Sequence, residues 1–284
     1  MKTALNGHTT PLILSAKNVE VKFNLRGKTL TAVRGASLDL YKGETLAIVG
    51  ESGCGKSVFT KSFIGMLDKN GYISGGSITY DGEDMAKYTA EQEWLKVRGK
   101  KIAMVFQDPM TGTAATMSIE ENMAIAQRRG KSRGLGWGVR EKDRECFREA
   151  LKELNIGLEN RLKVDTQYLS GGQRQALTLV MAALVKPKLL LLDEHTAALD
   201  PKTSEMVMEL TQKIVESHDL TTLMITHDMN HAIEYGNRLI MLYQGKIVVD
   251  VKGEEKKNLT VEDLMRLFQQ NSGETLVSDE LVLG

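Results

Sequence analysis

The chain has 284 residues, with 37 Lys and Arg against 37 Asp and Glu, and 42% of its residues are hydrophobic. This apolar content excludes a chain that is disordered throughout, and the length suffices for one large α/β domain or two smaller lobes. A net charge of zero argues against a nucleic-acid-binding protein that relies on bulk positive charge. We expect neither a membrane-spanning helix nor a secretory signal, and only two cysteines fit a reducing, cytosolic compartment.

The first elements in chain order are predicted to be mostly strands. Residues 12–24 and 31–49 alternate between apolar and polar side chains, which is typical of a small antiparallel sheet. The second stretch ends in a fully apolar run, and residues 56–67 then show helical spacing. Residues 76–80 and 101–106 are two further strand candidates.

After Pro109 the pattern becomes helical and later returns to alternating strands and helices. Helices are predicted over 118–129, 140–155, 171–185, 202–217 and 261–269, and strands over 188–192, 221–226 and 239–243. Apolar strands that alternate with helices predict a mostly parallel, covered sheet that carries a helical insert.

A phosphate-binding motif lies between the first apolar strand and the first helix. Its residues match G-x-x-x-x-G-K-[ST] and are Gly50, Glu51, Ser52, Gly53, Cys54, Gly55, Lys56 and Ser57. The glycines allow backbone N–H groups to turn toward a phosphate. We expect Lys56 to reach the β- and γ-phosphates and Ser57 to offer its hydroxyl to Mg²⁺. A tolerated small side chain explains Cys54 better than a redox thiol does.

Two acidic residues follow the leucine run 189–192. Asp193 and Glu194 are expected at the carboxyl end of a buried strand, where ligands collect in open α/β sheets. Adjacent carboxylates at such a position lose solvation unless a cation or water chemistry uses them. We expect Asp193 to hold Mg²⁺ through water and Glu194 to act as the general base on the attacking water.

A second glycine-rich loop, Leu169-Ser170-Gly171-Gly172-Gln173, begins a predicted helix. With this loop the sequence resembles the ATP-binding subunits of ABC transporters, over about residues 12 to 250. The resemblance rests on GESGCGKS at 50–57, LSGGQ at 169–173 and LLLLDE at 189–194, and on Gln107, the Ala198-Leu199-Asp200 turn and His227 in ITHD.

The resemblance implies an α/β fold: a P-loop NTPase core with a mostly parallel sheet, an N-terminal antiparallel β subdomain and an inserted α-helical subdomain. We expect the ATP-binding core at 12–107 and 186–250, the helical subdomain at 108–185 and a C-terminal tail at 251–284.

It also implies a head-to-tail dimer that binds two ATP molecules with Mg²⁺. In such a dimer the phosphate loop of one subunit faces Ser170, Gly171, Gly172 and Gln173 of the other, and Asp200 shapes the dimer contact. Gln107 would meet Mg²⁺ and the lytic water, and His227 would hold the γ-phosphate. Phe23 lies where the family usually stacks an aromatic ring on adenine, although a ring in a strand can also serve the core.

The implied function is ATP binding and hydrolysis that powers an ABC-type transporter, most simply a bacterial importer. The expected partners are a second copy or a paralogous ATPase subunit, separate transmembrane permease subunits and an extracytoplasmic binding protein, with no nucleic acid. The chain would then be cytoplasmic and peripheral on the inner face of the membrane. The alternatives are a soluble ABC-family ATPase of DNA repair or the ribosome, or an engineered chimera that only binds nucleotide.

Three features depart from the usual family pattern or add to it. His195 stands where Pro often follows the Asp-Glu pair, and a local variant of the turn is the preferred interpretation.

The segment from Arg128 to Arg148 carries eight Lys and Arg against three acids, which indicates either a solvated face or a contact near the membrane, and Trp137 within it suggests a partner contact. The sequence before about Met110 resembles the oligopeptide and dipeptide importer ATPases, and the sequence after Gly112 resembles another importer branch. We therefore hypothesise a seam at 110–112, a junction between two parent sequences that arose by recombination or by construction in the laboratory.

Overall fold

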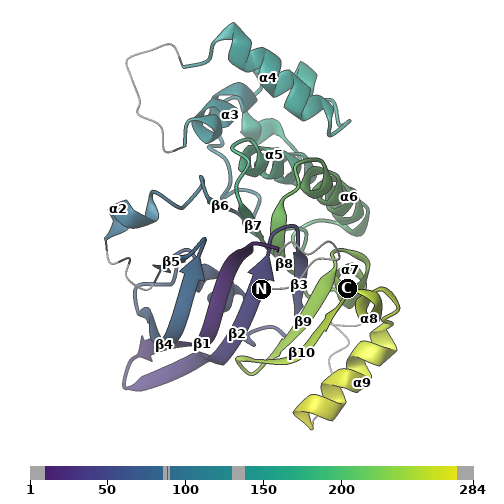
Figure 1. Cartoon of the computed structure of the whole chain (residues 1–284). Coiled ribbons are helices and arrows are strands. Elements are labelled where there is room, and N and C mark those ends of the chain that lie inside the picture. Colours follow the sequence, from purple (N-terminus) through teal and green to yellow (C-terminus); the bar gives the residue numbers. More distant parts are fainter. Residues whose placement is uncertain (1–9, 86–87, 89, 130–137, 274–284) are drawn as a thin grey trace. The chain divides into compact units, whose positions relative to one another are not determined.

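The computed structural model describes residues 10–85, 88, 90–129 and 138–273 (Figure 1). The chain divides into two compact units: unit 1 contains residues 1–94 and 221–284, and unit 2 contains residues 95–220. The helical subdomain predicted at 108–185 falls within unit 2. Its exact bounds, like those of the predicted core and tail, stay a prediction.

Unit 1 contains an antiparallel sheet with the strand order β2-β1-β4-β5 (Figure 1). The strands are β1 (Leu12–Leu25), β2 (Lys28–Tyr41), β4 (Gly71–Tyr80) and β5 (Glu83–Asp84). In β1, Leu14, Ala16, Val19 and Val21 are fully buried. The register of β1 with β2 shifts between Ala16 and Glu20, so the burial alternation continues on one face across the bulge.

The remaining strands of unit 1 are β3 (Thr45–Val49), β8 (Thr221–Ile225), β9 (Arg238–Tyr243) and β10 (Lys246–Lys252). Strand β3 pairs in parallel with both β8 and β9, and β10 is antiparallel to β9. The helices of this unit are α1 (Lys56–Ser62), α2 (Glu91–Trp94), α7 (Met229–Glu234), α8 (Glu254–Lys257) and α9 (Val261–Ser272). Strand β3 leads directly into the phosphate-loop segment and then into α1.

Unit 2 has a parallel pair of strands, β6 (Ile102–Val105) and β7 (Leu189–Asp193). Its helices are α3 (Ile119–Gln127), α4 (Glu141–Lys152), α5 (Gly171–Ala183) and α6 (Pro201–Ser217), with short 3-10 turns at Leu158–Asn160 and Thr166–Tyr168. Helix α5 packs against α3, α6 and β6. Eleven of its thirteen residues are buried, which makes it the central helix of the unit.

The predicted α/β class is confirmed, with an antiparallel N-terminal sheet, mostly parallel pairing of the other strands and a set of helices in the inserted region. Within the described residues, no helix combines the length and the apolar character that crossing a bilayer requires. Helix α1 is shorter than predicted, because the chain leaves helical conformation before Gly65, whose φ is +60°.

A buried lysine secures the C-terminal part of unit 1. Lys256 of α8 is only 2% exposed, and its Nζ donates hydrogen bonds to the carbonyl oxygens of Ile233, Tyr235 and Gly236 at 2.5, 3.0 and 2.9 Å. These carbonyls lie at the end of α7, where the helix leaves acceptors without intrahelical partners. Burial lowers the pKa of Lys256 to about 8, whereas the three acceptors match the three N–H groups of the ammonium form.

We expect Lys256→Met to lower the free energy of unfolding by about 3 kcal/mol, because it leaves the carbonyl groups at the end of α7 without donors in a buried site. The neighbouring exposed Lys257 pairs with Glu254 at 2.7 Å, so Lys257→Met is the matched control and should change stability by less than about 0.5 kcal/mol. Urea unfolding of the three proteins measures both effects. Equal stability of Lys256→Met and wild type would contradict this role.

Candidate functional site

Glycine geometry determines the shape of the phosphate loop. Gly50 and Gly55 have φ values of +149° and +106°, which L side chains rarely adopt. A Cβ at Gly50 would lie 2.2 Å from the Leu242 carbonyl oxygen, and one at Gly55 would lie 2.6 Å from the Ala32 carbonyl oxygen. A Cβ at Gly53 would meet no atom within 4 Å. The loop is therefore packed tightly against backbone at two glycines and is open at the third.

Backbone hydrogen bonds hold the loop from the side of β2 and the β9–β10 turn. The Gly245 N–H donates to the Cys54 carbonyl at 2.9 Å, and the Arg34 N–H donates to the Gly245 carbonyl at 2.8 Å. Gln244 and Gly245 both have positive φ, as in a tight hairpin turn. This support was not predicted, although the Gln244-Gly245 pair between two apolar runs is a hairpin signal.

Lys56 lies inside the loop and is 4% exposed. Its Nζ donates to the carbonyl oxygens of Gly50 at 2.7 Å and Glu51 at 3.1 Å. A phosphate oxygen is a stronger acceptor for an ammonium group than a neutral carbonyl. The arrangement therefore holds the lysine against the backbone of the loop, and its contact with phosphate stays a prediction.

Phe23 lies on β1 beside β4 and is only partly covered. Its ring lies over Gly71 of β4, where an added Cβ would be 2.6 Å from a ring carbon. The residue is half-buried, so part of the ring is covered by the sheet and part faces solvent. Gly71 thus makes room for the ring, and stacking on adenine stays a prediction.

His227 follows β8 in unit 1 and is half-buried. Among the described residues no hydrogen bond of its ring is found. The turn beneath it is ordered by Thr226, whose hydroxyl accepts from the Asp228 N–H at 3.0 Å. The side chain is thus available for a ligand contact, and its γ-phosphate role stays a prediction.

The carboxylate pair ends strand β7 in unit 2. The leucines are buried as predicted, and Asp193 at the end of the strand is 6% exposed. Glu194 is half-buried and has φ +47°, a left-handed conformation that is uncommon for a residue with a Cβ. Such backbone strain concentrates at functional sites, because the surrounding structure must hold the residue there.

His195 has a packing role inside unit 2. Its side chain is 2% exposed, and Nε2 lies 3.0 Å from the Thr211 hydroxyl of α6. That hydroxyl donates its only hydrogen to the Val207 carbonyl at 2.7 Å, so the imidazole is the donor and carries its proton on Nε2. This arrangement agrees with the preferred interpretation of His195 as a variant of the turn.

The second glycine-rich loop begins helix α5. The Ser170 hydroxyl accepts from the Gln173 N–H, and the Gln173 side chain accepts from the Ser170 N–H, both at 3.2 Å. This capping box fixes the first turn of the helix. A Cβ on Gly172 would lie 2.1 Å from the Thr203 side chain of α6, and one on Gly171 would lie 3.3 Å from Leu199. The glycines therefore permit the close approach of the two helices.

Two further predicted residues lie in unit 2. Gln107 comes two residues after β6 and is exposed. Asp200 is the N-cap of α6, where its Oδ1 accepts from the Thr203 N–H at 3.2 Å, and bonds with Thr203 lower the pKa of the Asp200 carboxyl. The capping role is compatible with the predicted dimer contact, which stays a prediction.

The predicted site residues divide between the two units. Unit 1 holds Phe23, the phosphate loop 50–57 and His227, whereas unit 2 holds Gln107, the loop 170–173, Asp193, Glu194 and Asp200. Within each unit the residues lie at the ends of strands or at the beginnings of helices. These are the positions where backbone N–H groups and carboxylates can face a ligand.

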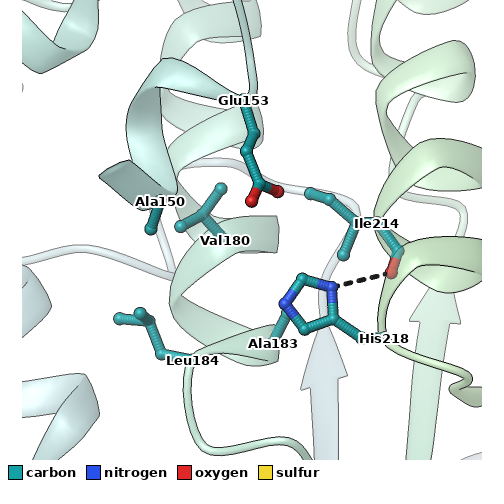
Figure 2. A pocket seen from close by; sticks show the side chains of 7 residues that line it. All are labelled: Ala150, Glu153, Val180, Ala183, Leu184, Ile214 and His218. Carbon is teal, nitrogen blue, oxygen red and sulfur yellow. Dashed lines mark hydrogen bonds between the residues drawn. The ribbon is translucent and has the colours of Figure 1, made fainter. Parts of the chain in front are cut away.

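A small hollow in unit 2 is bounded by α4, α5 and α6. Figure 2 shows Glu153 and His218 facing it, with Val180, Ala183 and Ile214 beside them. Its cavity volume is about 50 Å³, far below the roughly 300–1,000 Å³ of ordinary ligand pockets. A carboxylate at its edge also repels phosphate, so the hollow does not suit a nucleotide.

Ion pairs neutralise much of the described basic segment. Arg144 of α4 makes two hydrogen bonds to Glu120 of α3, at 2.8 and 3.0 Å, and a third to Glu141, and these bonds raise its pKa. Arg148 also pairs with Glu141. These contacts favour the solvated, internally paired interpretation. Trp137, Lys131 and Arg133 lie outside the described residues.

We expect iodoacetamide at pH 8 to alkylate Cys146 at least about ten times faster than Cys54. Cys146 is exposed on α4, whereas Cys54 is 7% exposed and its burial raises the pKa of the thiol, which lowers the thiolate fraction. Peptide mass spectrometry of wild type and Cys146→Ser gives the two rates, and urea should remove the difference. Equal labelling of the native thiols would show that Cys54 is reactive.

Comparisons with known proteins agree with this set of motifs. The family model described as "ABC transporter" matches residues 33–197. The tyrosine transport ATP-binding protein of Clostridioides difficile is 43% identical over 258 residues, which cover 90% of this chain and 99% of that protein. The oligopeptide transport ATP-binding protein AmiE of Streptococcus pneumoniae is 37% identical over 84% of this chain, which spans 66% of that longer protein.

Among solved structures, the dimeric post-hydrolysis state of an ATP-binding cassette bound to ADP and Pi has a TM-score of 0.71 and 31% identity. The match covers 84% of this chain and 98% of that one. The family match includes the phosphate loop, the second glycine-rich loop and the Asp-Glu pair. This chain therefore belongs to the ABC transporter ATP-binding family.

Proposed function

We propose that this chain is the ATP-hydrolysing subunit of a bacterial importer and works as a head-to-tail dimer. The proposal rests on the geometry of the phosphate loop. Its glycines pack against carbonyl groups and Lys56 is buried within it, which makes the loop a preorganised site for an anion. Preorganised donors stabilise charge without reorganisation during the reaction. Hydrolysis of ATP then opens a dimer that ATP binding had closed.

The residues fit Mg²⁺-ATP chemistry by type. Ser57, Gln107 and Asp193 offer the hydroxyl, amide and carboxylate oxygens that Mg²⁺ accepts, and Mg²⁺ usually takes few protein ligands beside substrate phosphates. When bound, the metal ion neutralises charge on the phosphates. Lys56 would hold the β- and γ-phosphates, and Phe23 would stack on the adenine.

Glu194 is proposed as the general base that accepts a proton from the attacking water. Its strained left-handed backbone supports this role, because such strain concentrates at functional sites. Gln107 would orient the same water, and His227 would donate to the γ-phosphate. In this scheme the protein contributes positioning and charge.

The second glycine-rich loop supports the dimer. Ser170, Gly171, Gly172 and Gln173 begin the 13-residue helix α5, whose first N–H groups are suited to phosphate. We propose that these residues contact the γ-phosphate of ATP on the phosphate loop of a second copy or a paralogous subunit, and that Asp200 lies at that contact. The related cassette bound to ADP and Pi is a dimer.

The relatives suggest the class of transporter. Their names specify tyrosine, oligopeptide and dipeptide transport, so we propose an importer of amino acids or peptides. Permease subunits and an extracytoplasmic binding protein would select the substrate, and this chain would sit at the cytoplasmic face of the membrane. No nucleic acid is part of this proposal.

Lys56→Ala should raise the Kd for ATP by roughly 10- to 100-fold, because it removes a charged hydrogen-bond donor from the phosphates. The exposed Lys69→Ala is the control and should leave the Kd unchanged. Equilibrium titration with a fluorescent ATP analogue measures both. Wild-type affinity in Lys56→Ala would contradict the role of this loop.

Glu194→Gln should bind ATP like wild type and lose hydrolysis by about 10²- to 10⁴-fold, because an amide cannot accept the proton. Unhydrolysed ATP should then accumulate a dimer, visible by size-exclusion chromatography with light scattering. Glu209→Gln, on the exposed side of α6, is the control for the same chemical change. Normal turnover in Glu194→Gln would reject the proposed base.

A further inference from the structure

Helix α5 contacts the Gln107 segment, here residues 106–110, directly. The Gln175 side chain is fully buried, and its Nε2 donates to the Phe106 carbonyl at 3.0 Å. Phe106 is the residue before Gln107, so this bond fixes the peptide group on which Gln107 begins. Both residues lie in unit 2, and α5 packs against β6.

The preceding residue of α5 contacts the other end of the segment. The Arg174 side chain is 3% exposed, and its guanidinium donates to the Thr166 carbonyl at 2.6 Å and to the Met110 sulfur. No ion pair with a carboxylate is found for Arg174 in the part of the chain that the structure describes. The buried guanidinium therefore links the end of this segment, at Met110, to the turn at Thr166 through neutral acceptors.

One turn further along α5, a third contact follows. Gly112 lies against Thr178, where an added Cβ would be 2.4 Å from Cγ2 and 2.6 Å from the hydroxyl oxygen. Between these anchors the chain makes a compact turn, since Asp108 accepts hydrogen bonds from the backbone N–H groups of Met110 and Thr111. The segment is therefore held at its beginning, at its end and just beyond.

The amide of Gln175 is not explained by packing. Its Oε1 is buried and has no hydrogen-bond partner among the described residues. An unpaired buried acceptor lowers stability, so an apolar side chain of the same size would suit the core better. The hydrogen bond from Gln175 Nε2 to the Phe106 carbonyl is therefore the interaction that an amide supplies and an apolar side chain would not.

We propose that Gln175 is a positioning residue for ATP hydrolysis, and that with Arg174 it makes the Gln107 segment and the second glycine-rich loop move as one body. This inference rests on the proposed function. Gln107 is exposed, so packing around its own side chain does not place it, and the anchored backbone at Phe106 is the contact that does. A nucleotide contact at Gln107 is passed through these bonds to the beginning of α5, which bears Ser170.

A double-mutant cycle separates positioning from simple stabilisation. Gln175→Met, which keeps the size and removes the donor, should lower kcat about ten-fold while the KM for ATP changes less than about two-fold. In a Gln107→Ala background the same substitution should have no further effect, because it acts through Gln107. Gln212→Met, the same substitution at an exposed position of α6, is the control. An unchanged kcat, or the same loss in both backgrounds, would overturn the proposal.

Hydrogen exchange tests the contact without turnover. Amides of residues 107–112 should exchange faster in Gln175→Met and in Gly112→Ala than in wild type. ATP should slow exchange at residues 170–174 in wild type and should not do so in the two variants. Unchanged exchange in both variants would overturn the inference. A wild-type chain without hydrolysis would instead contradict the proposed function, and the exchange result would still decide the positioning role.

Discussion

The close approach of backbone to backbone at the phosphate loop is the constraint on which unit 1 depends. The carbonyl groups of Ala32 and Leu242 lie where any Cβ at Gly55 or Gly50 would collide with them. Strand β2, the β9–β10 turn and the loop therefore fit only with glycine at both positions. The same packing keeps Lys56 at the loop and leaves Gly53 open. The shape of the proposed anion site thus depends on the sheet architecture as much as on the motif.

In unit 2 the backbone conformation and the contacts of α5 position the residues that are proposed to act on water. Strand β7 delivers Glu194 in a strained, left-handed conformation, and α5 holds the Gln107 segment through Arg174 and Gln175. Helix α5 also begins with the capping box at Ser170. Residues that are proposed to contact nucleotide in different subunits are therefore linked through one helix within a single chain. That linkage gives a physical route from hydrolysis to movement.

The sequence predicted the parts of the structure that local patterns control. The glycine motif, the leucine run before Asp193 and the serine cap of α5 each carry their signal within a few residues. Strand β10 and helices α7 and α8 were not predicted: the hairpin turn before β10 was overlooked, and α7 and α8 are short helices that depend on distant contacts such as those of Lys256. The supports of the site were missed for the same reason: the Ala32 carbonyl and the partners of Gln175 depend on tertiary packing. The seam at 110–112 is unconfirmed, since one natural protein matches 90% of the chain.

In the proposed dimer two chains share each site, with the phosphate loop of one and Ser170 to Gln173 of the other around a single ATP. Such a site exists only in the dimer, so activity must depend on association. The most direct measurement is the rate of Mg²⁺-ATP hydrolysis by the purified chain over a wide range of protein concentration. The hydrolysis rate per chain should rise with protein concentration and then level off. A constant rate per chain down to concentrations at which light scattering finds only monomer would contradict it.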